Sequence, residues 1–96
     1  MGIRFTASAR AQFLTVLSYL RTENPRAALR FRRRAEQVLR RLEKHPESGR
    51  KLPEFPELSY REVIVAPYRF FYRPEAGSVW VVAVWHGARL AEPPGD

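Results

Sequence analysis

Two arginines flank three aromatic residues in the run Pro-Tyr-Arg-Phe-Phe-Tyr-Arg, residues 67–73. If this run is a β-strand, Arg69, Phe71 and Arg73 share one face, because side chains alternate along a strand. Guanidinium groups bind phosphates and an aromatic ring stacks on a base, so this face fits a polyanionic target. The alternative is a solvent-facing strand whose arginines form cross-strand ion pairs, with Glu62 as the candidate partner. We favour the functional role for Arg69 and the ion-pair role for Arg73.

A histidine and an arginine follow the last hydrophobic segment, in Trp-His-Gly-Ala-Arg, residues 85–89. A histidine side chain has an ordinary pKa of about 6.5, so His86 is a candidate general acid or base. The alternative is a packed or surface histidine beside a tryptophan. His45 and His86 lack metal-ligand spacing, cysteine is absent, and no nucleotide-binding, metalloprotease or hydrolase motif occurs. We therefore expect neither a metal nor a cofactor.

The net charge of +7 is unevenly distributed along the 96 residues. Residues 1–53 contain 13 Lys/Arg and 4 Glu, whereas residues 54–96 contain 4 Arg and 6 acidic residues. Arginine dominates the basic residues, and its planar fork binds phosphate and carboxylate. The charge indicates a polyanionic target or an acidic protein partner. A solvated arginine-rich surface is the alternative.

Two helices are predicted in the first half of the chain. Apolar residues recur at helical spacing between residues 9 and 20, and Thr6 or Ser8 can cap the start. Asn24-Pro25 predicts the start of a second helix, because Asn is a good N-cap and Pro is tolerated at the first helical position. Pro46 should end this helix near His45. One face of the second helix is apolar and the other is rich in arginine.

Short strands are expected to position the candidate residues. An opening strand is predicted at residues 3–5, and alternating β-branched and aromatic residues predict strands at 60–65, 68–73 and 79–85, after a loop over 46–57. The order β-α-α-β-β-β predicts an α+β fold, with the helical hairpin packed on one face of a small antiparallel sheet. We expect the opposite face to be open. We also expect a single domain over residues 1–90 and a flexible tail over 91–96.

Four segments together resemble the RelE/ParE toxin superfamily of bacterial type II toxin–antitoxin systems, over about residues 3–90: 46–52, 60–63, 67–73 and 82–89. The resemblance implies a cognate antitoxin that folds on the toxin in a hetero-oligomer, in the bacterial cytoplasm and away from the membrane. We expect the antitoxin on the helical hairpin and the sheet edge, with Phe13, Leu17, Phe31 and Arg34 as candidate contacts.

The superfamily has two main activities. RelE-like members cleave mRNA in the ribosomal A site, and ParE-like members inhibit DNA gyrase and lack the nuclease residues. Arg69 and Arg89 match arginines of RelE-like relatives, but the lysine pair and the C-terminal tyrosine of those relatives have no counterpart here. Some relatives use a glutamate, an arginine and a histidine, a set that Glu62, Arg69 and His86 imitate.

The departures favour a ParE-like toxin that arrests growth by binding gyrase. In that case the candidate target-binding residues are Arg61, Arg69, Phe71 and Arg73. One alternative is a ribosome-dependent mRNA endoribonuclease, in which Arg69, His86, Arg89 and Glu62 are catalytic. A third is an inactive relative that only binds an antitoxin. Whether the chain is an enzyme stays open at this point.

Overall fold

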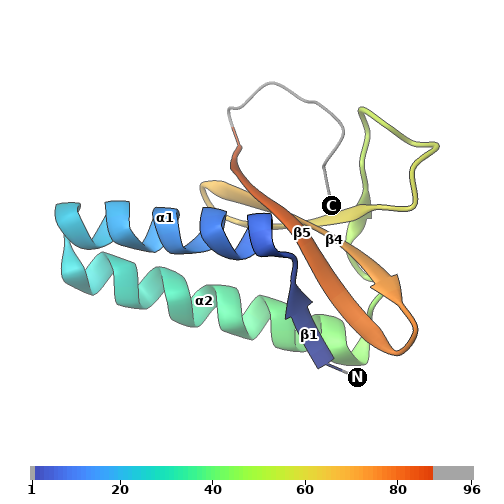
Figure 1. Ribbon diagram of the computed structural model, residues 1–96, viewed down its shortest axis with the longest axis horizontal. Helices are drawn as coiled ribbons and strands as arrows, with labels where there is room; N and C mark the ends of the chain where they lie inside the picture. The colour runs from blue at the N-terminus through green and yellow to red at the C-terminus, as the bar shows by residue number, and fades with distance from the viewer. Residues whose placement is uncertain (1, 88–96) are drawn as a thin grey trace.

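Two antiparallel helices cover one face of a five-stranded sheet in the computed structural model, which describes residues 2–87 (Figure 1). No helix in this part of the chain is long and apolar enough to cross a membrane. The elements follow one another as β1 (Gly2–Phe5), α1 (Ala7–Glu23), α2 (Pro25–Lys44), β2 (Arg50–Lys51), β3 (Arg61–Val65), β4 (Tyr68–Glu75) and β5 (Ser78–His86).

The helix boundaries come from local capping, as the sequence predicts. The Thr6 hydroxyl accepts a hydrogen bond of 3.2 Å from the backbone N–H of Ala9 and so caps α1. The Asn24 side chain accepts hydrogen bonds from the backbone N–H groups of Arg26 and Ala27, and Pro25 occupies the first turn of α2. The backbone N–H of Asn24 also donates to the last turn of α1. One residue therefore ends the first helix and starts the second.

The predicted α+β fold, with the helical hairpin on one face of the sheet, is confirmed, but the sheet is mixed and not antiparallel. Its strand order is β1-β5-β4-β3-β2, with β1 parallel to β5 and every other pair antiparallel. The two helices carry the chain from β1 across the sheet, and parallel pairing needs a crossover of this kind. β2 consists of only two residues inside the expected loop. It lies at the opposite edge from β1 and was not predicted.

The far face of the sheet is partly covered, which corrects the expectation of an open face: the residues around Phe71 on that face are buried, whereas Ile64 of β3 is 54% exposed. On the helix side, Phe31, Leu39 and Leu42 of α2 pack with Phe70 and other core residues. On the far side, Leu52, Phe55 and Tyr60 of the segment between α2 and β3 pack on the sheet. This second cluster is small, but Leu52 and Phe71 within it are each only 2% exposed.

The alternation predicted along β4 is confirmed. Phe70 and Tyr72 belong to the helix-side core, and Phe71 belongs to the cluster on the opposite face. The register with β5 shifts at this point, because Phe71 pairs with Ala83 whereas Tyr72 pairs with Val81. Val82 is therefore the extra residue of a β-bulge. On the other side of the bulge, the side chains of β5 again alternate between the helix-side core and the cluster on the far face.

Candidate functional site

A network of ion pairs lies under the segment that covers the far face of the sheet. Glu62 of β3 is 2% exposed, and its carboxylate accepts a hydrogen bond of 2.6 Å from Nε of Arg69 on β4. Arg50 of β2 binds the other carboxylate oxygen through Nε, at 2.9 Å, and through its terminal nitrogen. A terminal nitrogen of the Arg69 guanidinium, Nη2, donates to the Glu54 carboxylate at 3.1 Å. Two carboxylates thus face two guanidinium groups.

The network keeps Arg69 charged although the residue is only 9% exposed. Burial by itself lowers the pKa of Arg69, but the hydrogen bonds to Glu54 and Glu62 raise it above its ordinary value. The same hydrogen bond from Arg69 lowers the pKa of the Glu54 carboxyl. The guanidinium carbon also lies 4.9 Å from the centre of the Phe71 ring. These contacts use both edges and one face of the guanidinium.

The placement of Arg69 and Phe71 corrects the expectation that they form an exposed face. Phe71 lies in the cluster beneath the covering segment, with its ring edge-on to Trp85 at 4.9 Å. Arg69 pairs with Glu62, which is the cross-strand pairing named as the alternative for this face. Neither Arg50 nor Glu54 was predicted, because both lie in the segment between α2 and β3, where the sequence has no periodicity. A surface hollow of about 290 Å³ adjoins the network, with Arg50, Glu54 and Arg69 in its wall.

His86 lies on the other face of the sheet from this network. Its ring is edge-on to Tyr68 at 5.4 Å, and Tyr68 belongs to the helix-side core. Alternation places Glu62 and Arg69 on the opposite face. The structure therefore brings Glu62 and Arg69 together but does not add His86 to them. Arg89, the remaining nuclease candidate, lies outside the described residues, as does the expected tail over 91–96.

The two other target-binding candidates flank the network without joining it. Arg61 is half-buried and donates to the backbone carbonyl of Gly49 at 2.9 Å. Arg73 lies near the hairpin turn and donates to Glu75 of the same strand at 3.0 Å, so this ion pair lies within β4 and is not the cross-strand pair that was expected. Both side chains hold local structure, Arg61 in the segment before β2 and Arg73 at the end of β4.

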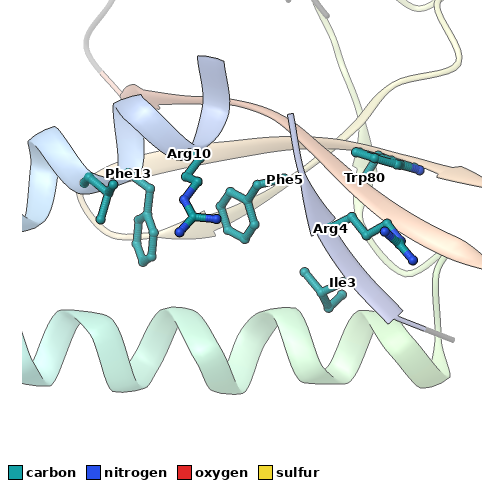
Figure 2. Close-up of a pocket in the computed structure, with 7 residues that line it drawn as sticks. Ile3, Arg4, Phe5, Arg10, Phe13 and Trp80 are labelled. Atoms are coloured by element: carbon teal, nitrogen blue, oxygen red, sulfur yellow. The ribbon is translucent and has the colours of Figure 1, made fainter. Parts of the chain in front are cut away.

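A second candidate site is the outer edge of β1, at one end of the sheet. A hollow of about 460 Å³ lies between this strand and the start of α1, lined by Ile3, Arg4, Phe5, Arg10, Phe13, Leu14 and Trp80 (Figure 2). The rings of Phe5 and Phe13 stack at 5.6 Å, and Arg4 lies over the Trp80 ring. Among the described strands β1 pairs with β5 only, so its other edge offers backbone hydrogen-bonding groups.

The four antitoxin-binding candidates divide into surface and core residues. Phe13 lines the hollow beside β1 and is partly exposed. Arg34 is exposed and donates to the carbonyl of Ala66 at 2.9 Å. Leu17 is 8% exposed and Phe31 is 3% exposed, both within the core between helices and sheet. The apolar stripe that suggested a partner surface at these two positions packs against the protein's own sheet.

Solved structures share this arrangement of helices and strands. The chain is similar to a chain of the structure described as "Chromosomal ParDE TA system from P. aeruginosa", with a TM-score of 0.69 and 15% sequence identity. The superposition covers 90% of this chain and 95% of that chain. The chain therefore shares the fold of that protein.

The sequence itself identifies the family. A family model described as "ParE toxin of type II toxin-antitoxin system, parDE" matches residues 3–91. No curated protein sequence matches the chain. Because the family model covers nearly the whole chain, the protein belongs to the ParE toxin family, as its sequence motifs predict.

Proposed function

We propose that this ParE-family toxin arrests growth in the bacterial cytoplasm by binding DNA gyrase, without cleaving RNA. The observation that carries the proposal is that Glu62 and Arg69 are paired with each other and largely buried. RNA cleavage through the 2′-hydroxyl needs a base that reaches the substrate and a cation that stabilises the phosphorane. Here the candidate base is buried, the candidate cation is neutralised by two carboxylates, and His86 lies on the other face of the sheet.

Two assays with the purified toxin test the proposal. We expect it to inhibit supercoiling of relaxed plasmid by gyrase and to leave mRNA intact on programmed ribosomes. His86→Ala should inhibit gyrase as well as the wild type does, because this exposed side chain is not needed for protein binding in the proposal. Ribosome-dependent cleavage that His86→Ala or Glu62→Gln abolishes would instead establish the nuclease alternative.

The cognate antitoxin is the second partner, and we place part of it at the edge of β1. An extended segment can add to this edge through backbone hydrogen bonds. Alternate apolar side chains would then enter the hollow beside Phe13 and Leu14, and acidic side chains would face Arg4 and Arg10. The open strand edge, the apolar hollow and the two arginines support this placement.

A further inference from the structure

Six cations on α2 form a stripe along the solvent-facing side of the helix: Arg26, Arg30, Arg33, Arg40, Arg41 and Lys44. At 3.6 residues per turn, all six lie within an arc of about 100°, and the stripe is about 27 Å long. Every one of them is exposed. The stripe lies opposite the buried face of α2 that contains Ala35 and Leu42, so it points directly away from the core.

No acidic residue interrupts this cationic stripe. Gln37 is the only other residue within the arc, and it is uncharged. The acidic residues of α2, Glu36 and Glu43, lie on one flank, and Glu36 pairs with Arg32 outside the stripe at 3.4 Å. Within residues 2–87, none of the six cations forms an ion pair. Like charges three and four residues apart repel one another on a helix, so an unoccupied stripe carries an electrostatic cost.

The composition of the stripe distinguishes nucleic acid from protein as the partner. Interfaces between proteins place apolar or aromatic side chains at their centre and are depleted in charge there. The arc of the stripe contains no apolar residue at all. Interfaces with duplex nucleic acid are strongly positive and polar, and the duplex presents one negative charge per about 1.7 Å of its axis. A straight cationic stripe without an apolar centre fits a phosphate backbone.

We propose that the α2 stripe is a sequence-independent binding site for the phosphate backbone of duplex DNA. Arg30 and Arg33 also line a hollow of about 400 Å³ beside the stripe, together with Arg34, whose guanidinium is oriented by the Ala66 carbonyl. The hollow also contains apolar residues, Leu20 and Phe31 among them, and lies beside the arc of the stripe, so the proposal depends on the six cations themselves. The site is distinct from the β1 edge and from the ion network under the sheet, and it does not depend on gyrase being the target.

The test compares two variants of the full chain that lose the same charge. The stripe variant replaces Arg30, Arg33 and Arg41 with Gln, and the control variant replaces Arg10, Arg21 and Arg32 with Gln. Gln and Arg have similar helix propensities, so both variants should keep the helices. Binding to a labelled DNA duplex of mixed sequence is measured by fluorescence anisotropy between about 50 and 200 mM salt.

We expect the wild type to bind with an affinity that falls steeply as salt rises. Each lost phosphate contact reduces the magnitude of the slope of log affinity against log salt by about 0.9. The slope of the stripe variant, which loses three cations, should therefore be smaller in magnitude by about 2.7, and the slope of the control variant should change much less. Equal losses in the two variants would overturn the proposal, because net charge alone would explain them. Absence of DNA binding at low salt would also overturn it.

Two competing ligands identify the chemistry of the partner. Duplex RNA presents the same backbone charge, so its affinity tests the assignment to DNA. Weaker binding of duplex RNA than of DNA supports the proposal, and tighter binding of RNA would overturn it. Polyglutamate presents carboxylates without phosphates. If polyglutamate binds as tightly as DNA, and the stripe variant loses both equally, the stripe is a surface for an acidic protein and the proposal is wrong.

Discussion

Glu54 makes the stability of the ion network depend on pH. The hydrogen bond from Arg69 lowers the pKa of this carboxyl below its ordinary value of 4.5. The stabilisation is therefore fully present above pH 4.5 and is lost as the pH falls through the lowered pKa. We expect Glu54→Gln to lower the free energy of unfolding at neutral pH, and the difference from wild type to shrink in acid.

Urea denaturation at a series of pH values measures this difference. Glu57→Gln is the matched control, because Glu57 is an exposed carboxylate in the same segment. A difference between Glu54→Gln and wild type that stays constant from neutral pH into acid would show that the Arg69–Glu54 pair does not stabilise the fold.

Gly49 packs closely against the side chain of Tyr72 on β4. Its backbone N–H donates to the Tyr72 hydroxyl at 2.9 Å, and that hydroxyl donates to the Pro46 carbonyl at 2.7 Å. A Cβ at position 49 would lie 2.8 Å from Cζ of the fully buried Tyr72 ring. We expect Gly49→Ala to destabilise the protein by about 2 kcal/mol, as overpacking in a core does. Thermal unfolding checks this, with Gly2→Ala as a control that meets no atom within 4 Å. An unchanged melting temperature for Gly49→Ala would contradict the close packing.

Ion-pair partners can be predicted from the sequence where both residues lie on neighbouring strands. Alternation names Arg69 and Glu62 as possible partners because they share a face on neighbouring strands. It does not identify Arg50 or Glu54, whose positions depend on the path of an irregular segment. For the same reason it does not predict that Phe71 is buried, since the cover over this face comes from a part of the chain without periodicity.

The exposed leucines of the two helices allow the proposed antitoxin site to be tested at the scale of one element. Leu14 of α1 is 54% exposed and lines the hollow beside β1, whereas Leu29 of α2 is 47% exposed and lies elsewhere. We expect Leu14→Glu to weaken antitoxin binding by at least about tenfold, through lost apolar burial and repulsion of acidic residues. Leu29→Glu should bind like the wild type. Titration calorimetry with the cognate antitoxin measures both, and equal affinities for the two variants would argue against the β1 edge.

Local signals predict the helices better than the sheet. Asn24-Pro25 contains the whole signal for the junction between α1 and α2, because capping and proline geometry act within a few residues. The partner of β1 depends on a crossover of both helices, which no local pattern encodes. β2 is too short to show a period of two. The alternation along β4 therefore predicts which side chains share a face of the strand. It does not predict which segments of the chain pack on each face.

At the scale of the whole molecule, opposite charges are concentrated in one place and like charges in another. The network around Arg69 brings two carboxylates and two guanidinium groups together in a partly buried cluster. The α2 stripe places six cations on an exposed face without an acidic residue among them. Salt screens exposed charges far more than buried ones. Added salt should therefore relieve the repulsion along the stripe more than it weakens the buried network.

This contrast predicts that salt stabilises the free toxin. We expect the free energy of unfolding to rise between low salt and about 0.15 M, where the Debye length has fallen to about 8 Å and neighbouring cations on α2 are partly screened. The stripe variant with Gln at positions 30, 33 and 41 should show a smaller rise, and the variant with Gln at positions 10, 21 and 32 a rise closer to that of the wild type. Urea denaturation in KCl measures the three slopes without any ligand. If salt lowers the stability of the wild type, the ion pairs outweigh the repulsion along α2, and the stripe is not a source of strain that a polyanion would relieve.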